Sequence, residues 1–401
     1  MSEALDQFRQ ATRAWLEENC PASMRTPFAS DSEWVWGGRR PKFHNADART
    51  WLERMGQRGW TTPTWPSKYG GGGLSAEEAA ILDEELRAIG ARVPLKSFGV
   101  WMLAPVLFDF GTEEQRLQHL PPIVRGEIRW CQGYSEPGAG SDLASLQTRA
   151  VLDGDHFVVD GQKIWTSHAE QADWMFCLVR TDPNASKHEG VSFLLIDMAT
   201  PGISVRPIQL ISGASPFCET FFDGVRVPAG NLVGKPGQGW TIAKALLGHE
   251  RALIAHSRDT ATTEEEQLEV MAKRYLGVDH GVLADPVLRD RITQANLDGL
   301  CNSLTLQRSA ELVQARGAPG PESSMFKLYG TELNKRRKEL RVRIAGYQGL
   351  GWEGPGFATD ELRMTREWLR SRANTIEGGT SEVQLNIIAR RVLGLPDGKD
   401  K

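Results

Sequence analysis

The sequence predicts a mainly α-helical protein with a β domain in its middle. We expect an N-terminal helical domain (1–125), an antiparallel β-barrel or sandwich (126–235) and a C-terminal helical bundle (236–401). The first third has amphipathic helical periodicity, the middle has short β-rich runs, and the last part has long helical stretches without interior proline. A length of 401 residues fits two or three domains.

Helix signals dominate the N-terminal domain. Apolar residues recur at the helical period on one face of the first segment: Leu5, Phe8, Trp15 and Leu16. The segment 75–78 has the pattern of a capping box and predicts a helix through Leu86, which Gly90 is suited to end. A second capping box is predicted at 112–115.

Strand signals begin after residue 126. The short runs rich in β-branched and aromatic residues are 157–159, 174–180, 191–196 and 203–207. Turn dipeptides stand at 153–154, 160–161 and 201–202. Runs spaced by eight to twelve residues indicate a small antiparallel barrel or sandwich and not a parallel sheet.

The helical period returns near residue 239 and continues almost to the end. The predicted helices are 240–255, 264–276, 286–316, 325–345 and a last one around 382–393. Long helices with short breaks are typical of a bundle, so a helical bundle is expected here.

Composition excludes several classes of function. Lys and Arg number 47 and Asp and Glu number 51, so no basic excess exists to bind nucleic acid. The acidic start predicts no signal peptide, and no run of ~18 apolar residues predicts membrane insertion. Five scattered cysteines without a Cys-x-x-Cys pair predict neither a metal site nor disulfides. A cytoplasmic location is therefore expected.

Three segments carry chemical signals. The turn at 134–142 has two glycines whose lack of side chains lets the backbone approach a flat ligand, although an ordinary loop explains it equally well. The run 162–167 offers Trp165 for stacking and two hydroxyls for hydrogen bonds, or a plain strand. In the segment 375–382, Thr380 or Ser381 is suited to cap the last helix.

Together these segments resemble the acyl-CoA dehydrogenase family. The motifs that carry the resemblance stand in the family's order at 135–142, 162–167, 222–228, 249–251 and 378–382. The likeness runs from about residue 5 to residue 396. It implies an N-terminal helical domain, a middle β domain and a C-terminal four-helix bundle, together with FAD and an acyl-CoA thioester of lipid metabolism.

The resemblance also implies site residues. Those expected at the FAD are Gln132, Tyr134, Ser135, Gly140, Ser141, Trp165, Thr166, Ser167, Arg274, Gln348, Thr380 and Glu382. Those expected at the substrate are Ser141, Arg251 and Gly378. Ser135 would lie on the pyrimidine side of the flavin ring, Trp165 against the ring, and Thr166 and Ser167 near N5.

Two segments depart from the commonest family pattern. The segment that reaches the FAD of a neighbouring subunit has its nearest match at 273–277, which contains Arg274. The loop that holds the adenine end is represented by 348–354, where Trp352 replaces a glycine.

The reaction needs a carboxylate that removes the α-proton while hydride leaves Cβ for flavin N5. Many family members carry this base directly before Gly-Thr-Ser, but here that position is Gly378, and Glu377 is displaced by one residue. Others use a Glu-Arg pair on a bundle helix, which Glu250 and Arg251 match. Glu250 is therefore the expected base and Glu377 its rival, although a solvated helix acid also explains Glu250.

The expected function is α,β-dehydrogenation of an acyl-CoA to the trans-2-enoyl-CoA, with electrons passed to an electron-transfer flavoprotein. One alternative is a flavin oxidase of the same fold, acting on acyl-CoA or on a nitroalkane. Another is a non-catalytic partner subunit of a heteromeric dehydrogenase. A homodimer or homotetramer is expected, with a mixed assembly as the alternative.

Overall fold

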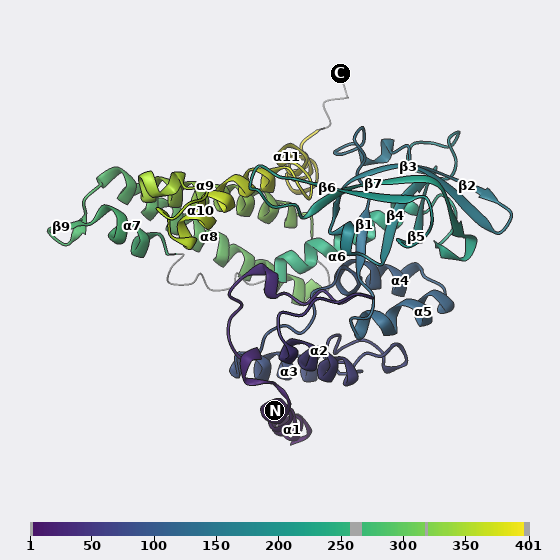
Figure 1. Cartoon of the computed structure of the whole chain (residues 1–401), viewed down its shortest axis with the longest axis horizontal. Coiled ribbons are helices and arrows are strands. Elements are labelled where there is room, and N and C mark those ends of the chain that lie inside the picture. The colour runs from purple at the N-terminus through teal and green to yellow at the C-terminus, as the bar shows by residue number, and fades with distance from the viewer. Residues whose placement is uncertain (1–2, 257–266, 317–319, 397–401) are drawn as a thin grey trace. The chain divides into compact units, whose positions relative to one another are not determined.

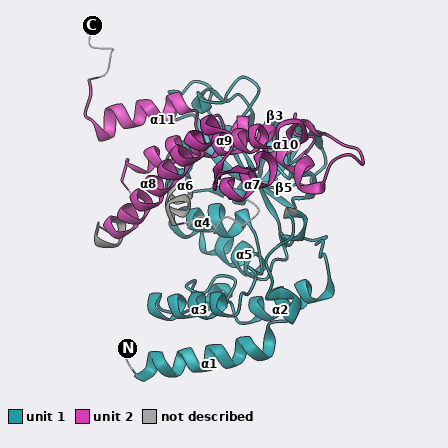
Figure 2. Ribbon diagram, turned by 90° about the vertical axis from the view of Figure 1, so that its left-hand side faces the viewer, with its two compact units in different colours: residues 1–208, 216–249 teal, residues 209–215, 250–401 magenta. Residues whose placement is uncertain are grey.

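The computed structural model describes residues 3–256, 267–316 and 320–396, without the side chains of 31, 249–256 and 313–316. The chain divides into two compact units. Unit 1 comprises 1–208 and 216–249, and unit 2 comprises 209–215 and 250–401 (Figure 2). Each unit is described by itself below.

The N-terminal part of unit 1 is helical (Figure 1). Its helices are α1 (Glu3–Asn19), α2 (Ala46–Gln57), α3 (Ala76–Ala88), α4 (Ala104–Phe110) and α5 (Glu113–Val124). Both predicted capping boxes are confirmed, with Ser75 at the start of α3 and Thr112 at the start of α5. Gly90, just beyond α3, has a φ of +64°, a conformation that glycine adopts without strain.

An eight-stranded sheet follows, with the strand order β6-β7-β3-β2-β4-β5-β8 and β1 beside β4. The strands are β1 (Trp130–Gly133), β2 (Arg149–Asp153), β3 (His156–Ser167), β4 (Trp174–Arg180), β5 (Val191–Asp197), β6 (Ile203–Ile208), β7 (Phe217–Pro228) and β8 (Leu232–Val233). Pairing is antiparallel except where β1 and β2 run parallel to β4. The predicted middle β domain is present, with this parallel pairing as an addition.

One predicted turn is wrong. Asp160 and Gly161 lie inside β3, where the pairing with β7 shifts register, so they form a bulge within a continuous strand. Gly161 has a φ of +148°, and a Cβ there would come within 2.7 Å of Thr148. A glycine that bends a strand looks the same in sequence as one that ends it.

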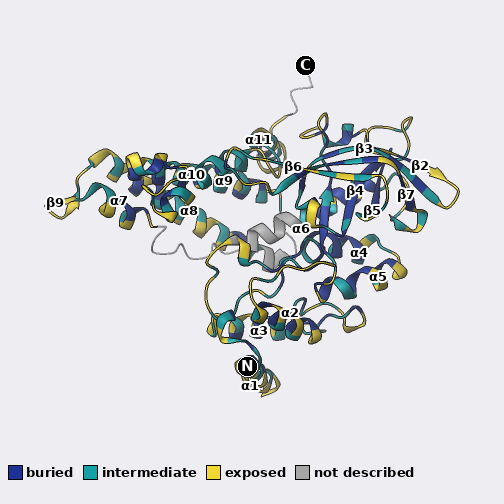
Figure 3. Cartoon of the chain, viewed as in Figure 1, coloured by how far each residue is buried: buried dark blue, intermediate teal, exposed yellow. Residues whose placement is uncertain are grey.

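Strands β4 and β5 are buried on both faces, as Figure 3 shows by their dark colour. Phe176 and Leu178 pack into a core shared with α4, α5 and α6 (Gly239–His256). Met175 and Cys177, on the opposite face, pack against residues of β3 and β7. Successive side chains of a strand point to opposite faces, so a continuous apolar run indicates a strand covered on both sides.

Unit 2 contains α7 (Leu268–Leu276), α8 (Pro286–Arg316), α9 (Ser323–Ala345), α10 (Thr359–Ser371) and α11 (Ser381–Ile387). A short hairpin, β9 (Val278–Asp279) with β10 (Val282–Leu283), joins α7 to α8. Helices α7 to α10 contribute to one hydrophobic core, which includes Met271, Ile292, Leu340 and Met364. This is the bundle that the helical period predicts, although α10 was not among the predicted helices.

Part of one predicted helix lies outside the described residues. Residues 264–266, the start of the predicted helix 264–276, are not among the described residues. The domain boundaries at 125 and 235 stay a prediction. Within the described residues, none of the helices combines the length and the apolar character needed to span a bilayer.

Candidate active site

The turn at 134–142 is fastened to strand β3. It follows β1 directly, and the backbone N–H of Ile164 donates to the Ser135 carbonyl oxygen over 2.8 Å. Glu136 and Ala139 exchange two backbone hydrogen bonds of 3.1 and 3.0 Å, which close the turn. The turn therefore lies beside Trp165, the residue that follows Ile164.

Two glycines of this turn have open space where a side chain would stand. A Cβ added at Gly138 or Gly140 would meet nothing within 4 Å among the described atoms, and neither residue has a left-handed φ. Gly133, at the end of β1, contrasts with them, because a Cβ there would stand 2.3 Å from the Met175 sulfur. The open space in front of Gly138 and Gly140 leaves room for a ligand to approach the backbone.

Trp165 faces outward because β3 contains a second bulge. The pairing with β7 shifts between Lys163 and Thr166, so Thr166 points inward where regular alternation would bury Trp165. Trp165 has a φ of +61° and is 52% exposed, with its ring edge-on to Phe217 at 6.1 Å. A bulky residue in the left-handed region is rare, and such strain concentrates at functional sites.

The neighbours of Trp165 supply polar groups. Thr166 is fully buried, and its hydroxyl has no hydrogen-bond partner among the described residues. Ser167 is half-buried and pairs with Phe217 of β7. Buried hydroxyls are usually satisfied, so the Thr166 hydroxyl is suited to a partner that the protein itself does not provide.

The remaining predicted residues of this region lie close by in the chain. Gln132 is half-buried in β1 opposite Phe176 of β4, and Tyr134 is 6% exposed with its ring edge-on to Phe176 at 6.1 Å. Ser141 is exposed at the end of the turn, next to Asp142, which forms an ion pair with Lys187. The structure thus gathers the predicted residues of the turn and of β3 in one place.

A buried ion pair within these motifs is missing from the sequence prediction. Lys163 is fully buried, and its ammonium group contacts the Glu136 carboxylate at 2.8 Å. Burial alone would raise the pKa of Glu136, but Lys163, the Thr148 side chain and the backbone N–H of Gln147 outweigh it, so the pKa is lowered. The sequence signal for this pair is limited to an acid in the turn and a lysine in the strand that follows it.

His168 follows the Trp165 segment directly. It has a φ of +56°, and its ring lies 5.0 Å from that of Trp36. Burial, assisted by the positive charges of Arg129 and Lys96, lowers the pKa of His168 to about 4. His168 is therefore a neutral imidazole at physiological pH.

Glu377, the rival base, is engaged within unit 2. Arg370 binds its two oxygens at 3.3 and 2.8 Å, and the Asn374 side chain donates to it at 2.6 Å. Both carboxylate oxygens of Glu377 are therefore already occupied by partners within unit 2.

The residues of the loop after Glu377 have structural roles. Gly378 and Gly379 have φ values of +62° and +93°. The Thr380 hydroxyl accepts a hydrogen bond from the Val383 N–H over 3.2 Å and caps α11, as predicted. The exposed Glu382 has a lowered pKa because its own backbone N–H and the Thr380 side chain hydrogen-bond its carboxylate.

Arg274 and Gln348 lie beside two other parts of α10. Arg274 forms an ion pair of 3.0 Å with Asp360 at the start of α10, and Gln348 is part of the turn 346–350 between α9 and α10. Arg370, which binds Glu377, lies ten residues beyond Asp360 in α10, or roughly 15 Å along the helix axis. The turn that contains Gln348 lies beside the middle of α10, where the Thr365 hydroxyl donates to the Gly349 carbonyl oxygen over 2.9 Å.

The expected base and its neighbour fall on helix α6. Glu250 and Arg251 belong to helix α6, but their side chains lie outside the described part of the chain.

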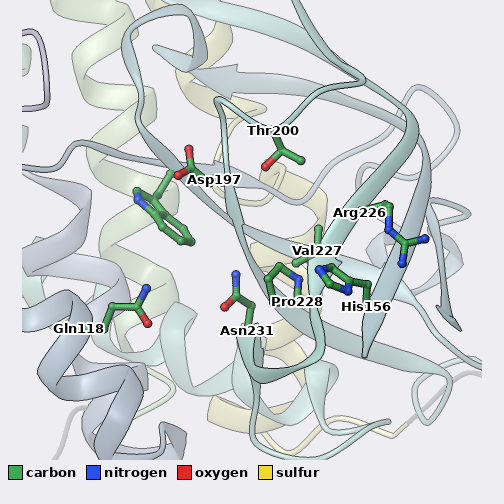
Figure 4. A pocket seen from close by; sticks show the side chains of 9 residues that line it. Gln118, His156, Asp197, Thr200, Arg226, Val227, Pro228 and Asn231 are labelled. Atoms are coloured by element: carbon green, nitrogen blue, oxygen red, sulfur yellow. The ribbon is translucent and has the colours of Figure 1, made fainter. Parts of the chain in front are cut away.

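A polar cavity of about 330 Å³ lies elsewhere in unit 1 (Figure 4). It is lined by Gln118, His156, Trp174, Asp197, Thr200, Arg226, Val227, Pro228 and Asn231. His156 begins β3 and Trp165 stands near its end, roughly 30 Å further along the strand. This cavity is thus separate from the motif residues.

Known proteins share both the sequence and the fold of this chain. Sequence profiles of the acyl-CoA dehydrogenase N-terminal, middle and C-terminal domains match residues 2–127, 131–225 and 237–393. The acyl-CoA dehydrogenase IpdE1 of Mycobacterium tuberculosis is 38% identical over 399 residues, which are 98% of each chain. The chain belongs to the acyl-CoA dehydrogenase family.

Solved structures of this family have the same architecture. The Tcur3481–Tcur3483 steroid ACAD is 32% identical, with a TM-score of 0.72 over 99% of both chains. The ChsE4–ChsE5 complex from Mycobacterium tuberculosis is 29% identical, again with a TM-score of 0.72 over 99% of both chains. As a member of this family, the protein is an FAD-dependent oxidoreductase that dehydrogenates acyl-CoA.

Proposed function

We propose that this acyl-CoA dehydrogenase converts an acyl-CoA to its trans-2-enoyl-CoA and passes the electrons to an electron-transfer flavoprotein. The observation that carries the proposal is the group of features beside the turn at 134–142. These are the open glycines 138 and 140, the exposed and strained Trp165, and the unpartnered hydroxyl of Thr166. A flat ring with a hydrogen-bonding edge fits all of them.

In this proposal the flavin ring lies against Trp165 and the turn that contains Ser135. Bound FAD supplies a hydride acceptor. The Thr166 hydroxyl, which is buried without a partner among the described residues, donates to the ring edge, and Ser167 lies near it. Gln132, Tyr134 and Gly140 border the cofactor, and Ser141, exposed at the end of the turn, faces the CoA arm.

The base is assigned to Glu250, which removes the α-proton of the thioester. Support comes from Glu377, which Arg370 and Asn374 already engage. Glu250 is followed by Arg251, the pattern of the family members that keep the base on a bundle helix. Arg251 and Gly378 are assigned to substrate binding.

The assembly is proposed to be a homodimer or homotetramer, with a mixed assembly as the alternative. Arg274 binds the start of α10, roughly 15 Å along the helix axis from Arg370, and the turn that contains Gln348 lies beside the middle of α10. That separation suits contacts with two different parts of the cofactor, or with the cofactors of two subunits. A relative solved as the ChsE4–ChsE5 complex supports the mixed alternative.

The acyl group is proposed to include bulky ring systems, because one structural relative is a steroid ACAD. The test is anaerobic mixing of the holoprotein with straight, branched, cyclic and steroid-derived acyl-CoAs. We expect bleaching of the flavin, formation of the enoyl-CoA and reoxidation by electron-transfer flavoprotein. Stoichiometric peroxide in air would instead establish an oxidase, and a purified chain without flavin would establish a non-catalytic subunit.

A further inference from the structure

Two charged side chains are buried between the motifs that the flavin is proposed to contact. Lys163 is fully buried and Glu136 is 8% exposed, and their charged groups stand 2.8 Å apart. Burying two charges costs free energy that an ion pair recovers only when further hydrogen bonds satisfy it. The additional bonds of this pair therefore show what it holds in place.

Those hydrogen bonds connect the ion pair to two further segments of the chain. The Lys163 ammonium also donates to the Tyr134 carbonyl oxygen over 3.1 Å. The Glu136 carboxylate accepts from the N–H of Gln147 at 2.6 Å and from that of Thr148 at 2.8 Å. One ion pair thus joins the start of the turn, the segment that leads into β2, and strand β3.

Lys163 also stands at the bulge that orients Trp165. It is the last regularly paired residue of β3 before the register shift, with Thr220 of β7 opposite. The next residue, Ile164, donates to the Ser135 carbonyl oxygen, and Trp165 follows in its left-handed conformation. Anchoring Lys163 therefore fixes where the bulge begins and which way Trp165 faces.

We propose that Glu136 and Lys163 form a positioning pair that holds the turn at 134–142 and the Trp165–Ser167 segment in one rigid frame, arranged for the flavin before it binds. Neither residue needs to touch the cofactor. The inference rests on the proposed placement of the flavin beside Trp165. A preformed site binds more tightly because its ordering cost is met during folding.

The test compares full-length apoproteins of Glu136→Gln, Lys163→Met and the double variant by titration with FAD. Each single variant is expected to raise the Kd for FAD by at least about tenfold, and the double variant by less than the product of the two. The matched control is Arg149→Met. Arg149 lies in β2 and forms an exposed ion pair of 3.1 Å with Asp160 of β3, the strand that contains Lys163. The control should leave the Kd within about twofold.

Folded single variants that bind FAD as tightly as the parent overturn the proposal. If the variants do not fold, hydrogen exchange of the parent decides. The amides of Gln147, Thr148 and Ile164 should be as protected without FAD as with it. Rapid exchange of these amides without FAD would contradict a preformed frame.

A parallel titration of Trp165→Ala separates this inference from the proposed function. If that variant binds FAD as the parent does, the placement of the flavin is wrong and the positioning pair loses its basis. If Trp165→Ala weakens binding and Glu136→Gln does not, only the positioning pair is wrong.

Discussion

The turn at 134–142 and the loop at 377–382 both carry family motifs. The loop residues have structural roles within the chain, whereas several residues of the turn and of the adjoining strand do not. In the loop, Glu377 is bound by Arg370, and Thr380 caps α11. In the turn, a Cβ added at Gly140 would meet no described atom within 4 Å, and the adjoining Trp165 is exposed in a strained conformation.

This difference separates residues kept for the fold from residues kept for a ligand. A side chain that caps a helix or completes an ion pair has a sufficient reason within the chain. An exposed tryptophan with a φ of +61° lowers stability unless something outside the chain compensates. We therefore assign flavin-ring binding mainly to the turn and to β3.

The largest expected effect concerns the base. Glu250→Gln should lower the rate of flavin reduction by acyl-CoA by about 10²–10⁴-fold, because an amide cannot accept the α-proton. FAD and acyl-CoA binding should persist, since the amide keeps the shape of the side chain. Stopped-flow absorbance under nitrogen measures the reduction rate.

The matched control is Glu377→Gln, whose rate should fall by less than about tenfold because Glu377 is engaged by Arg370. If Glu377→Gln is inactive while Glu250→Gln still bleaches promptly, the base lies in the C-terminal loop and the assignment to α6 is wrong.

A smaller effect is expected for the proposed stacking residue. Trp165→Ala should weaken FAD binding by about 1–3 kcal/mol, because the ring loses its aromatic contact and buried area. Alanine keeps the Cβ that makes a positive φ unfavourable and the exposed ring contributes little to the fold, so thermal stability without FAD should change little. Calorimetric titration with an unchanged affinity would remove Trp165 from the site.

A still smaller effect is expected in the loop of unit 2. Thr380→Ala should destabilise α11 by about 1 kcal/mol, because the Val383 N–H loses its capping oxygen. Thr380→Ser, which keeps the hydroxyl, is the control and should restore protection. Hydrogen exchange of the α11 amides measures the change, and equal protection in the alanine variant would contradict a capping role.

Local patterns predicted most of the fold. The capping boxes at Ser75 and Thr112 start their helices through hydrogen bonds within a few residues. The apolar run 174–180 indicates a strand that is covered on both faces. Helix α10 was missed because it is highly charged and follows a glycine-rich segment. The sequence predicts a turn at Gly161 where the structure has a bulge, because a bulge depends on the pairing of β3 with β7.

The site was predicted less completely, for a similar reason. Trp165 and the turn were identified from motifs. The partnership of Glu136 with Lys163 joins residues 27 positions apart and exists only once β3 lies beside the turn. The binding of Glu377 by Arg370 likewise depends on how the chain turns after α10.

Two glycines test the contrast between the turn and the loop most directly. Gly140→Ala and Gly379→Ala should be compared by thermal unfolding without FAD and by calorimetric titration with FAD. Gly379 has a φ of +93°, and a Cβ there would stand 2.7 Å from the Gln384 amide nitrogen. This variant should lose more than about 1 kcal/mol of stability.

Gly140→Ala should keep its stability within about 0.5 kcal/mol, since its Cβ meets no described atom. Its FAD affinity should nevertheless fall by at least about tenfold, because the methyl group occupies the space proposed for the flavin. A Gly140→Ala variant that is as stable as the parent and binds FAD equally tightly would contradict the account.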